Sequence, residues 1–347
     1  MPQRVTDDSA GRRVLITGTA GFIGFHLSKM LLNEGFVVHG LDGMTDYYDV
    51  QLKRRRHQML LQHAHFTATE AMLEDSEAVA RAMDEARPDI IIHLAAQAGV
   101  RYSLEEPCTY VDSNIVGSFT ILEAARQAGV QHLLMASTSS VYGANELMPF
   151  VETHATAHPV SLYAATKLAN EAMAHSYAHL HHIPTTMFRF FTVYGPWGRP
   201  DLALYKFVSA ILNGQPIDIY NNGQMARDFT YIGDLVRAIR LLIDVPPVPV
   251  AERAESIEGD SLSPAAPWRT VNIGNGQPVA LLDFITAIED ALDRPARRNY
   301  MPMQAGDVAV TWADCTLLER LTGYRPQTDI AVGVNEFVRW YKEYYDK

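Results

Sequence analysis

Hydrophobic and polar positions follow two periods that alternate along this chain. Short apolar runs predict buried strands, and longer stretches with apolar positions three and four apart predict helices. The predicted strands cover residues 13–17, 37–41, 88–94, 132–136, 185–191 and 270–274. The predicted helices cover residues 25–33, 110–127, 281–292 and 328–345. Because strands that alternate with helices pair in parallel through right-handed crossovers, the pattern predicts a doubly wound α/β fold.

A glycine-rich turn separates the first predicted strand from the first predicted helix. It reads Gly18-Thr19-Ala20-Gly21-Phe22-Ile23-Gly24. Such glycines let the chain turn tightly and approach a pyrophosphate, and the helix N-terminus supplies amide donors. The second strand ends in Asp42, 18 residues after Gly24, where a carboxylate binds ribose hydroxyls and repels a 2′-phosphate. The turn therefore predicts a Rossmann-type dinucleotide site that prefers NAD to NADP. The alternative is an ordinary turn aspartate in a glycine-rich loop.

Small or hydroxyl-bearing residues follow the later strands. They are Ala95, Ala96, Thr138, Ser139, Ser140 and Thr192. In a parallel sheet, ligands bind beyond the carboxyl ends of the strands. We therefore expect these residues, the glycine turn and Asp42 to line one cleft.

The glycine- and proline-rich segment at residues 192–200 marks a change in the chain, because it is too irregular to predict a helix or a strand. We expect a dinucleotide-binding domain over residues 12–191, to which residues 229–276 return. Residues 192–228 and 277–347 are expected to form a smaller C-terminal lobe that binds the substrate.

The charge of the chain limits its partners. Its formal net charge is −11, which argues against a nucleic-acid partner because nucleic acids require basic surface. The basic run at residues 53–56 predicts only a solvated helix face. His175 and His179 are four apart, but no carboxylate or cysteine completes a metal site around them, so no metal is expected.

The composition also indicates a compartment. Two cysteines far apart in 347 residues form no disulfide-type pattern, which predicts a reducing cytoplasm. The polar N-terminal residues lack the apolar core of a signal peptide. No apolar run approaches the ~18 residues that a membrane span requires. We therefore expect a cytoplasmic protein that does not insert into a membrane and that binds a small molecule.

The stretch Tyr163-Ala164-Ala165-Thr166-Lys167 carries the main chemical signal. Residues four apart on a helix share one face, so the phenol of Tyr163 is expected beside the ammonium of Lys167. A neighbouring positive charge favours the phenolate and lowers the pKa of a tyrosine from its usual value of about 10 towards neutrality. The pair is therefore a candidate acid/base. Pairs with this spacing also occur on solvated helices, so the other motifs carry part of the argument.

Taken together, the glycine turn, Asp42, the Ser/Thr cluster at residues 137–140 and the Tyr163/Lys167 pair resemble the extended short-chain dehydrogenase/reductase family of nucleotide-sugar enzymes. Within that family, the runs at residues 93–103 and 189–201 are most similar to the UDP-glucuronate 4-epimerases. The resemblance implies that NAD stays bound through each turnover, that Tyr163 is the acid/base and that Lys167 holds the nicotinamide ribose. It also implies a homodimer formed by the helices at residues 110–127 and 161–179.

The resemblance implies two sets of contact residues. The cofactor set is Gly18, Gly21, Phe22, Ile23, Gly24, Asp42, Ala95, Ala96, Asn114, Tyr163 and Lys167. The substrate set is Thr138, Ser139, Ser140, Thr192, Arg199, Arg227 and Asp307. Thr138 matches a family position that bonds the sugar hydroxyl, Arg227 one that binds the diphosphate, and Asp307 one near the uridine ribose. The neutral hydroxyls and the charge of Arg199 are candidates to hold a hexuronate carboxylate, with ordinary turn capping as the alternative for the hydroxyls.

The chemistry of such a site can be argued independently. Inverting a secondary alcohol with an unactivated C–H bond requires a ketone, so Tyr163 takes the C4 hydroxyl proton while the hydride goes to NAD. We therefore expect epimerisation of UDP-glucuronate to UDP-galacturonate through a 4-keto intermediate. A UDP-glucose/galactose 4-epimerase and a UDP-glucuronate decarboxylase remain alternatives, although Ser139-Ser140 stands where relatives with dehydratase or decarboxylase activity carry acidic residues. A nucleotide-sensing regulatory protein is the alternative that is not an enzyme.

Overall fold

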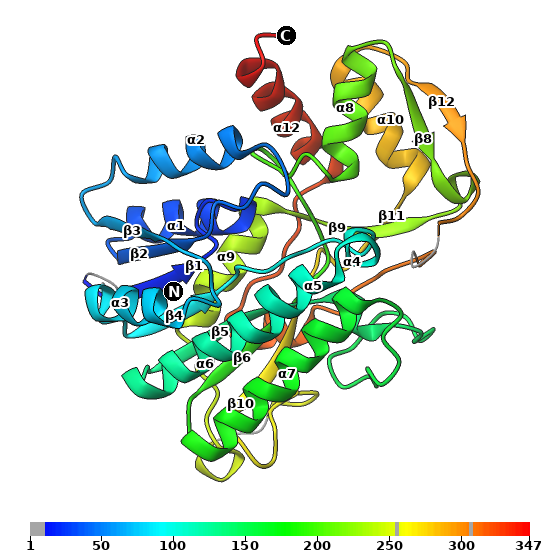
Figure 1. Cartoon of the computed structure of the whole chain (residues 1–347). Coiled ribbons are helices and arrows are strands. Elements are labelled where there is room, and N and C mark those ends of the chain that lie inside the picture. The colour runs from blue at the N-terminus through cyan, green and yellow to red at the C-terminus, as the bar shows by residue number, and fades with distance from the viewer. Residues whose placement is uncertain (1–10, 254–256, 305–307) are drawn as a thin grey trace, which may run out of the picture.

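A seven-stranded parallel sheet forms the centre of the protein in a computed structural model that describes residues 11–253, 257–304 and 308–347 (Figure 1). In spatial order its strands are β10 (Trp268–Ile273), β6 (Thr185–Phe190), β5 (His132–Thr138), β4 (Ile90–His93), β1 (Arg13–Thr17), β2 (Val37–Asp42) and β3 (Phe66–Glu70). The strand order reverses between β4 and β1, which pair in parallel. Such a switch point opens a crevice for ligands at the carboxyl ends of the strands.

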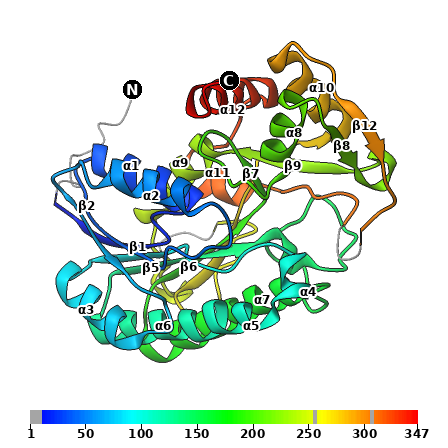
Figure 2. The ribbon, with the colours of Figure 1, turned by 45° about the horizontal axis from the view of Figure 1, so that its top comes forward.

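Helices cover both faces of this sheet (Figure 2). One layer consists of α1 (Phe22–Asn33), α2 (Val50–Leu60), α9 (Ile232–Ile243) and α11 (Thr316–Thr322). The opposite layer consists of α3 (Ser76–Ala86), α6 (Gly117–Ala128) and α7 (Leu162–His181). Side chains of a strand alternate between its two faces, so Val14 and Ile16 pack into the core beneath α1 while Leu15 packs into the core beneath α3. The predicted doubly wound α/β fold is confirmed.

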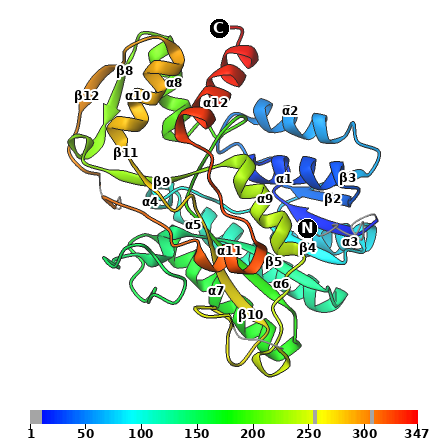
Figure 3. The same cartoon turned by 180° about the vertical axis from the view of Figure 1, so that it is seen from behind.

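The C-terminal part of the chain contributes smaller sheets and a second core, gathered at one end of the molecule (Figure 3). One sheet has the order β11 (Pro278–Ala280), β9 (Ala226–Tyr231) and β7 (Thr192–Tyr194), and β8 (Pro216–Ile219) pairs with β12 (Arg297–Tyr300). The helices here are α8 (Ala203–Leu212), α10 (Leu281–Leu292) and α12 (Ile330–Tyr344). Phe207, Phe284 and Phe337 pack together among these elements. The division of the chain into two domains stays a prediction, and α11 packs against α9 and β10 of the larger sheet's layers.

Two short helices lead from β4 into α6. They are α4 (Tyr102–Glu105) and α5 (Pro107–Tyr110), and a π-helical turn (Val111–Val116) joins α5 to α6.

None of the helices in the described ranges is both long enough and apolar enough to cross a membrane.

Two local expectations are wrong. Residues 192–200 are not wholly irregular, because β7 forms by pairing with β9, a contact between distant segments that local composition does not reveal. The basic run in α2 is not a solvated face. Arg54 and Arg55 are exposed, but Lys53 is 6% exposed and Arg56 is 0% exposed. Arg56 lies four residues from both Leu52 and Leu60 and so occupies the buried stripe of the helix.

The central strands should contribute most to stability. Leu134 in β5 is 0% exposed, whereas Leu147 in a surface loop is 66% exposed. Leu134→Ala is expected to lower the free energy of unfolding by about 2–5 kcal/mol, because it removes buried methyl groups and leaves a cavity. Leu147→Ala should change it by less than about 0.5 kcal/mol. Urea denaturation of the two variants measures the difference, and equal midpoints would contradict this assignment of the core.

Candidate active site

A cavity of about 670 Å³ lies beyond the carboxyl ends of the strands, where the smaller sheets approach the large one. Predicted residues from both contact sets line it: Gly18, Gly21, Phe22, Ile23, Gly24, Asp42, Ala95, Ala96, Thr138, Ser139, Ser140, Tyr163, Lys167, Thr192 and Arg199. They come from the carboxyl ends of β1, β2, β4 and β5, from the starts of α1 and α7, and from β7 and the loop that follows it. The expectation that these strand ends meet in one cleft is confirmed.

The glycine turn is shaped by close backbone contacts. A Cβ on Gly24 would lie 2.1 Å from the carbonyl oxygen of Gly18, and Gly18 has a φ of +80°. Neither position therefore accepts a side chain without movement of the turn. No side chain caps α1, which begins directly after Gly21, so its first amides have no side-chain acceptor. This arrangement fits a pyrophosphate, which accepts hydrogen bonds from helix N-terminal amides.

Asp42 faces the same turn from the end of β2. Its Oδ2 accepts a hydrogen bond from the backbone N–H of Ala20 at 2.9 Å, and its Oδ1 accepts one from Met44 at 2.9 Å. These two bonds orient the carboxylate towards the cavity, and each oxygen keeps a lone pair for a further donor. A ribose with two free hydroxyls supplies such donors, so the turn and Asp42 together fit a dinucleotide such as NAD.

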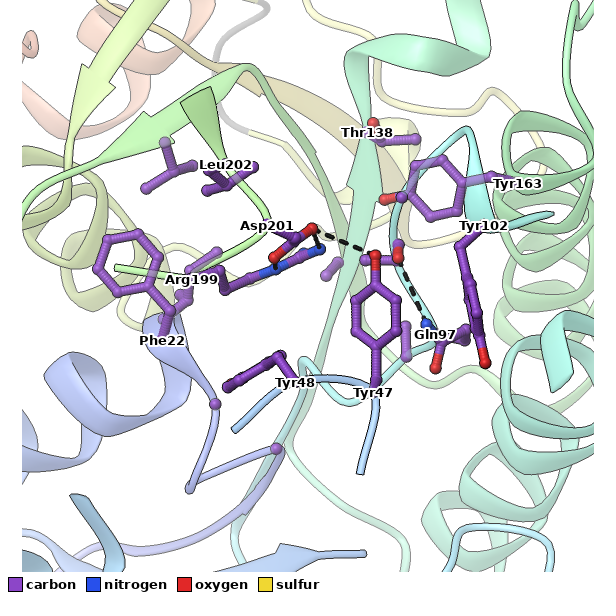
Figure 4. A pocket seen from close by; sticks show the side chains of 18 of the residues that line it. Phe22, Tyr47, Tyr48, Gln97, Tyr102, Thr138, Tyr163, Arg199, Asp201 and Leu202 are labelled. Carbon is purple, nitrogen blue, oxygen red and sulfur yellow. Dashed lines mark hydrogen bonds and ion pairs between the residues drawn. The ribbon is translucent and has the colours of Figure 1, made fainter. Parts of the chain in front are cut away.

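Tyr163 lies in the first turn of α7, where Ser161 caps the helix by accepting a hydrogen bond from the N–H of Ala164 at 3.1 Å. Figure 4 shows its phenol beside Thr138 at one end of the cavity. Burial raises the pKa of Tyr163 above its usual value, although a hydrogen bond with Thr138 and the charge of Arg199 act to lower it. The expectation of a lowered pKa is therefore wrong for this state of the protein, because removal of the phenol from water outweighs its neighbours.

Lys167 follows one turn later and is only 2% exposed. Burial lowers the pKa of its ammonium to about 8, and the carboxylate of Glu171 opposes that shift. Its Nζ makes no hydrogen bond to another residue of the described part of the chain. A buried ammonium without a partner at the cavity wall fits a ligand that brings hydroxyl acceptors, such as a ribose.

A buried ion pair stabilises the part of the site that contains Tyr163 and Lys167. Glu171 in α7 accepts hydrogen bonds from Nε and Nη2 of Arg189 in β6, at 3.0 and 2.8 Å. The same carboxylate accepts a hydrogen bond from the hydroxyl of Ser137 in β5 at 2.6 Å. Ser137 precedes Thr138, and Glu171 lies one helical turn after Lys167. The pair therefore ties β6 to β5, which carries Thr138, and to α7, which carries Tyr163 and Lys167.

Hydroxyls and one arginine lie at the other predicted substrate positions. Thr138 accepts a hydrogen bond from the N–H of Ser140 at 3.2 Å. The guanidinium of Arg199 donates two hydrogen bonds to Asp201, from Nε at 3.0 Å and from Nη2 at 2.6 Å. Burial alone would raise the pKa of Asp201, but Arg199 outweighs burial and holds that pKa below its usual value. Tyr47 also donates to Asp201 at 3.2 Å, as Figure 4 shows.

Two of the described contact residues that the sequence predicts, Asn114 and Arg227, do not line the cavity. Asn114 is 0% exposed, and its side-chain amide bonds the backbone N–H and carbonyl of Gln97 at 2.9 and 3.0 Å. It therefore fixes the conformation of the loop after β4 without lining the cavity. Arg227 in β9 donates to the carbonyls of Ala226 and Ala309 at 3.0 and 2.9 Å. Asp307 lies outside the described residues.

The sequence reasoning missed several lining residues. Tyr47, Tyr48 and Lys53 come from the segment after β2, and Tyr102 comes from α4. Lys53 donates to the carbonyl of Thr45 at 2.6 Å, and its ammonium lies 4.5 Å from the ring centre of Tyr48. Tyr47 and Tyr48, five and six residues after Asp42, were a usable signal, because tyrosines combine a large apolar surface with a polar end and are enriched at binding interfaces. The described residues contain no group of three or more His, Cys, Asp and Glu side chains placed to hold a metal ion.

The glycine turn at the switch point and the tyrosine–lysine pair in the same cavity define the class of protein, an α/β protein built to bind a dinucleotide beside a proton-transfer group. The chain belongs to the NAD dependent epimerase/dehydratase family, whose model matches residues 14–251. The family expectation from the sequence is thereby confirmed.

Relatives of known name cover nearly the whole chain. A protein of Rhizobium meliloti (strain 1021) named "Probable UDP-glucuronate 4-epimerase" is 58% identical over 96% of this chain and 98% of its own length. UDP-glucuronate 4-epimerase 1 of Arabidopsis thaliana is 43% identical over 97% of this chain and 78% of its own length.

A solved structure has the same overall arrangement. It is UDP-glucuronic acid 4-epimerase from Bacillus cereus in complex with UDP-glucuronic acid and NAD, with a TM-score of 0.84 and 30% identity over 96% of this chain and 99% of that one. A tyrosine-to-phenylalanine mutant of that enzyme, in complex with a 4-deoxy-4-fluoro analogue and NAD, has a TM-score of 0.82 and 29% identity, with 96% and 99% coverage.

The burial of Lys167 predicts a specific dependence of stability on pH. The pKa of its ammonium falls from 10.5 to about 8 in the fold, so the unfolded chain binds this proton more tightly. Lys167→Met is therefore expected to raise the free energy of unfolding of the cofactor-free protein at pH 7, by an amount of the order of 2–3 kcal/mol. Wild-type stability should recover as pH rises from about 8 to 10.5, and the advantage of the variant should vanish over that window.

Urea denaturation at intervals between pH 7 and 10.5 measures this effect. Lys29→Met is the matched control, because Lys29 is exposed in α1 and its removal should leave the stability curve nearly unchanged. If Lys167→Met is still more stable than the wild type by the same amount at high pH, removal of the buried charge is not the reason for its higher free energy of unfolding.

Proposed function

We propose that the protein catalyses the NAD-dependent 4-epimerisation of UDP-glucuronate to UDP-galacturonate through a 4-keto intermediate. The observation that carries the proposal is the meeting of Tyr163 and Thr138 in the cavity that begins at the glycine turn. The names of the relatives and of the solved complexes support the same reaction. The proposal joins a proton-transfer group and a dinucleotide site, which are the two parts that inversion through a ketone requires.

The glycine turn and Asp42 are proposed to hold NAD, with Lys167 on the nicotinamide ribose and Ala95 and Ala96 against the flat part of the cofactor. When bound, NAD would supply the acceptor and donor of the hydride at C4 of the hexose and a positive charge near the phenol. The residues of the chain bind and orient both ligands and handle the proton.

Tyr163 is the proposed acid/base. Its phenolate accepts the proton of the C4 hydroxyl as the ketone forms, and its phenol returns a proton to the C4 oxygen after the hexose has turned. Because burial raises the pKa of Tyr163, the neighbours that lower it decide whether the base is available, and these are the hydrogen bond with Thr138 and the charge of Arg199. Thr138 also orients the C4 oxygen towards the phenol.

The carboxylates of the cavity argue against dehydration. Among the described residues, the acidic side chains that line it are Asp42, Glu74, Asp201 and Asp218. Asp42 accepts hydrogen bonds at the glycine turn, and Asp201 is bound in a bidentate pair to Arg199. Ser139 and Ser140, rather than an acid, follow Thr138, so no carboxylate on β5 is available to remove the C5 proton.

One observation favours a second candidate, a UDP-glucose/galactose 4-epimerase. Arg199 is the cation proposed for the hexuronate carboxylate, but Asp201 already neutralises it. A UDP-glucose 4-epimerase from Thermotoga maritima, in complex with UDP-glucose, also resembles this chain, with a TM-score of 0.81 and 27% identity over 96% of this chain and 99% of that one. The hydroxyls of Ser139, Ser140 and Thr192 favour the first candidate, because neutral hydroxyl groups can donate hydrogen bonds to the carboxylate of the hexuronate.

The nucleotide end is proposed from fewer contacts. Arg227 is the proposed diphosphate ligand and Asp307 the proposed contact of the uridine ribose. Arg101 and Tyr220 also line the cavity. The guanidinium carbon of Arg101 lies 4.9 Å from the ring centre of Tyr220. A cationic and aromatic pair of this kind suits a nucleobase and its phosphates.

The protein is further proposed to be a cytoplasmic homodimer formed through α6 and α7, which pack side by side. Val116, which ends the π-helical turn, and Phe119 near the start of α6 are 42% and 49% exposed, and Leu180 at the end of α7 is 64% exposed. Exposed apolar residues on neighbouring helices favour burial against a second copy in a four-helix contact.

Incubation of the purified protein with UDP-glucuronate, followed by proton NMR, tests the reaction. UDP-galacturonate should form, and Tyr163→Phe should lower kcat by at least about 10²-fold because the proton acceptor is lost. Tyr177→Phe is the matched control on the same helix, since Tyr177 bonds Glu123 away from the cavity. A UDP-pentose product would mean decarboxylation, conversion of UDP-glucose alone would move the substrate to neutral hexoses, and turnover of neither would favour a sensor.

Light scattering coupled to size-exclusion chromatography tests the dimer. The double variant Val116→Glu/Phe119→Glu is expected to run with half the molar mass of the wild type, because buried carboxylates without partners oppose association. Leu147→Glu places the same charge on an exposed loop residue and should leave the mass unchanged. A monomeric wild type, or a double variant that stays dimeric, would contradict the proposed interface.

A further inference from the structure

Arg56 is a fully buried cation that the proposed reaction does not use. It is 0% exposed and is among the largest fully buried side chains of the described residues. A buried arginine is costly unless its donors are satisfied. Its Nη1 donates to the carbonyl of Ala20 and to the hydroxyl of Tyr48, both at 2.9 Å. Its Nη2 donates to the carbonyl of Trp197 at 2.5 Å, with Gly198 at 3.5 Å.

These acceptors belong to two separate parts of the site. Ala20 lies in the glycine turn proposed to hold the cofactor, whereas Trp197 lies in the loop that runs from β7 towards α8. That loop carries Arg199 and Asp201 into the cavity two and four residues later. One guanidinium therefore bridges the dinucleotide turn and the loop at the hexose end.

The backbone of this loop is strained. Trp197 has a φ of +60°, a conformation that bulky residues adopt only when the surrounding structure imposes it. Its ring centre lies 5.7 Å from that of Phe25 in α1 and 5.3 Å from that of Trp340 in α12. Aromatic packing thus holds the side chain, while Arg56 holds the carbonyl.

A second side chain forms a hydrogen bond to Pro196, the residue before Trp197. His26 in α1 forms a hydrogen bond between its Nε2 and the carbonyl oxygen of Pro196 at 2.9 Å. Burial lowers the pKa of His26 to about 4, so the ring is neutral near pH 7 and Nε2–H donates. Successive carbonyls of Pro196 and Trp197 are therefore bound from α1 and α2, the helices next to the glycine turn.

We propose that Arg56 is a positioning residue that holds the strained backbone at Trp197 against the glycine turn, and so sets Arg199 and Asp201 at the hexose end of the cavity. The inference rests on the proposed function, because it assumes that the hexose of a UDP-sugar lies beside Arg199. A role in folding alone would affect all ligands equally. A positioning role affects ligands that carry the hexose and spares UDP, which lacks it.

The test compares Arg56→Lys with the wild-type holoenzyme. Lysine keeps the charge but has one donor centre, so it cannot bridge the carbonyls of Ala20 and Trp197 as a planar guanidinium does. KM and Kd for UDP-glucuronate are expected to rise about tenfold, which is the loss of roughly one charge-assisted hydrogen bond. The Kd of UDP, measured by calorimetry, should stay within about twofold, because its contacts are remote from the loop. Arg54→Lys, on the exposed face of α2, is the matched control and should leave both constants unchanged.

Equal changes for UDP and UDP-glucuronate, or no change for either, would overturn the inference. A different result contradicts the proposed function, namely that the wild type converts no UDP-hexose. In that case the comparison of the Kd values of UDP and UDP-glucuronate still decides the role of Arg56. Should Arg56→Lys not fold, His26→Phe replaces it, because it removes one loop contact and keeps a ring beside Phe22 and Phe25. His26→Phe should raise the Kd of UDP-glucuronate about threefold and spare UDP, and the absence of that difference would overturn the proposal.

Discussion

The buried ion pair between Glu171 and Arg189 is the interaction on which the rest of the site depends. It joins α7 to β6, and through the hydroxyl of Ser137 it also joins β5. Of these elements, α7 brings Tyr163 and Lys167 to the cavity and β5 brings Thr138. Replacing one partner would leave an uncompensated charge in the interior, which costs several kcal/mol, so the pair constrains the geometry as well as the stability. The negative charge of Glu171 also opposes the loss of the proton from Lys167.

The site concentrates charged groups in a place where their removal from water is costly. Lys167, Lys53 and Arg56 are nearly or fully buried, and burial lowers the pKa of both lysines. Each group is retained beside the cavity, where a ligand or a backbone carbonyl can compensate its desolvation. Binding of a dinucleotide and a UDP-sugar would therefore stabilise the protein as well as position the reacting atoms, because ligands that bind only the folded state shift the folding equilibrium.

The order in which the elements pack explains why the cofactor turn and the hexose end are linked. The helix that begins at the glycine turn is α1, and it packs against α2 and α9 of the same layer. From this layer His26 and Arg56 reach the loop after β7. The two ends of one cavity thus share a common support, in which hydrogen bonds and ring contacts connect the glycine turn to the loop that carries Arg199.

Local sequence patterns were sufficient for the fold class, for the strands and helices with clear periods, and for the residues at the strand ends. Those features depend on neighbouring residues and on the rule that parallel strands expose their carboxyl ends along one edge, so Gly18, Asp42, Thr138 and Thr192 could be assigned to one cleft from the sequence. The direction of the pKa shift of Tyr163, the pairing of Arg199 with Asp201 and the burial of Arg56 were decided by tertiary structure. The pKa shift and the burial depend on desolvation and on partners from distant segments, and the Arg199–Asp201 pair, although only two residues apart, depends on the conformation of an irregular loop. No periodicity along the chain encodes any of these.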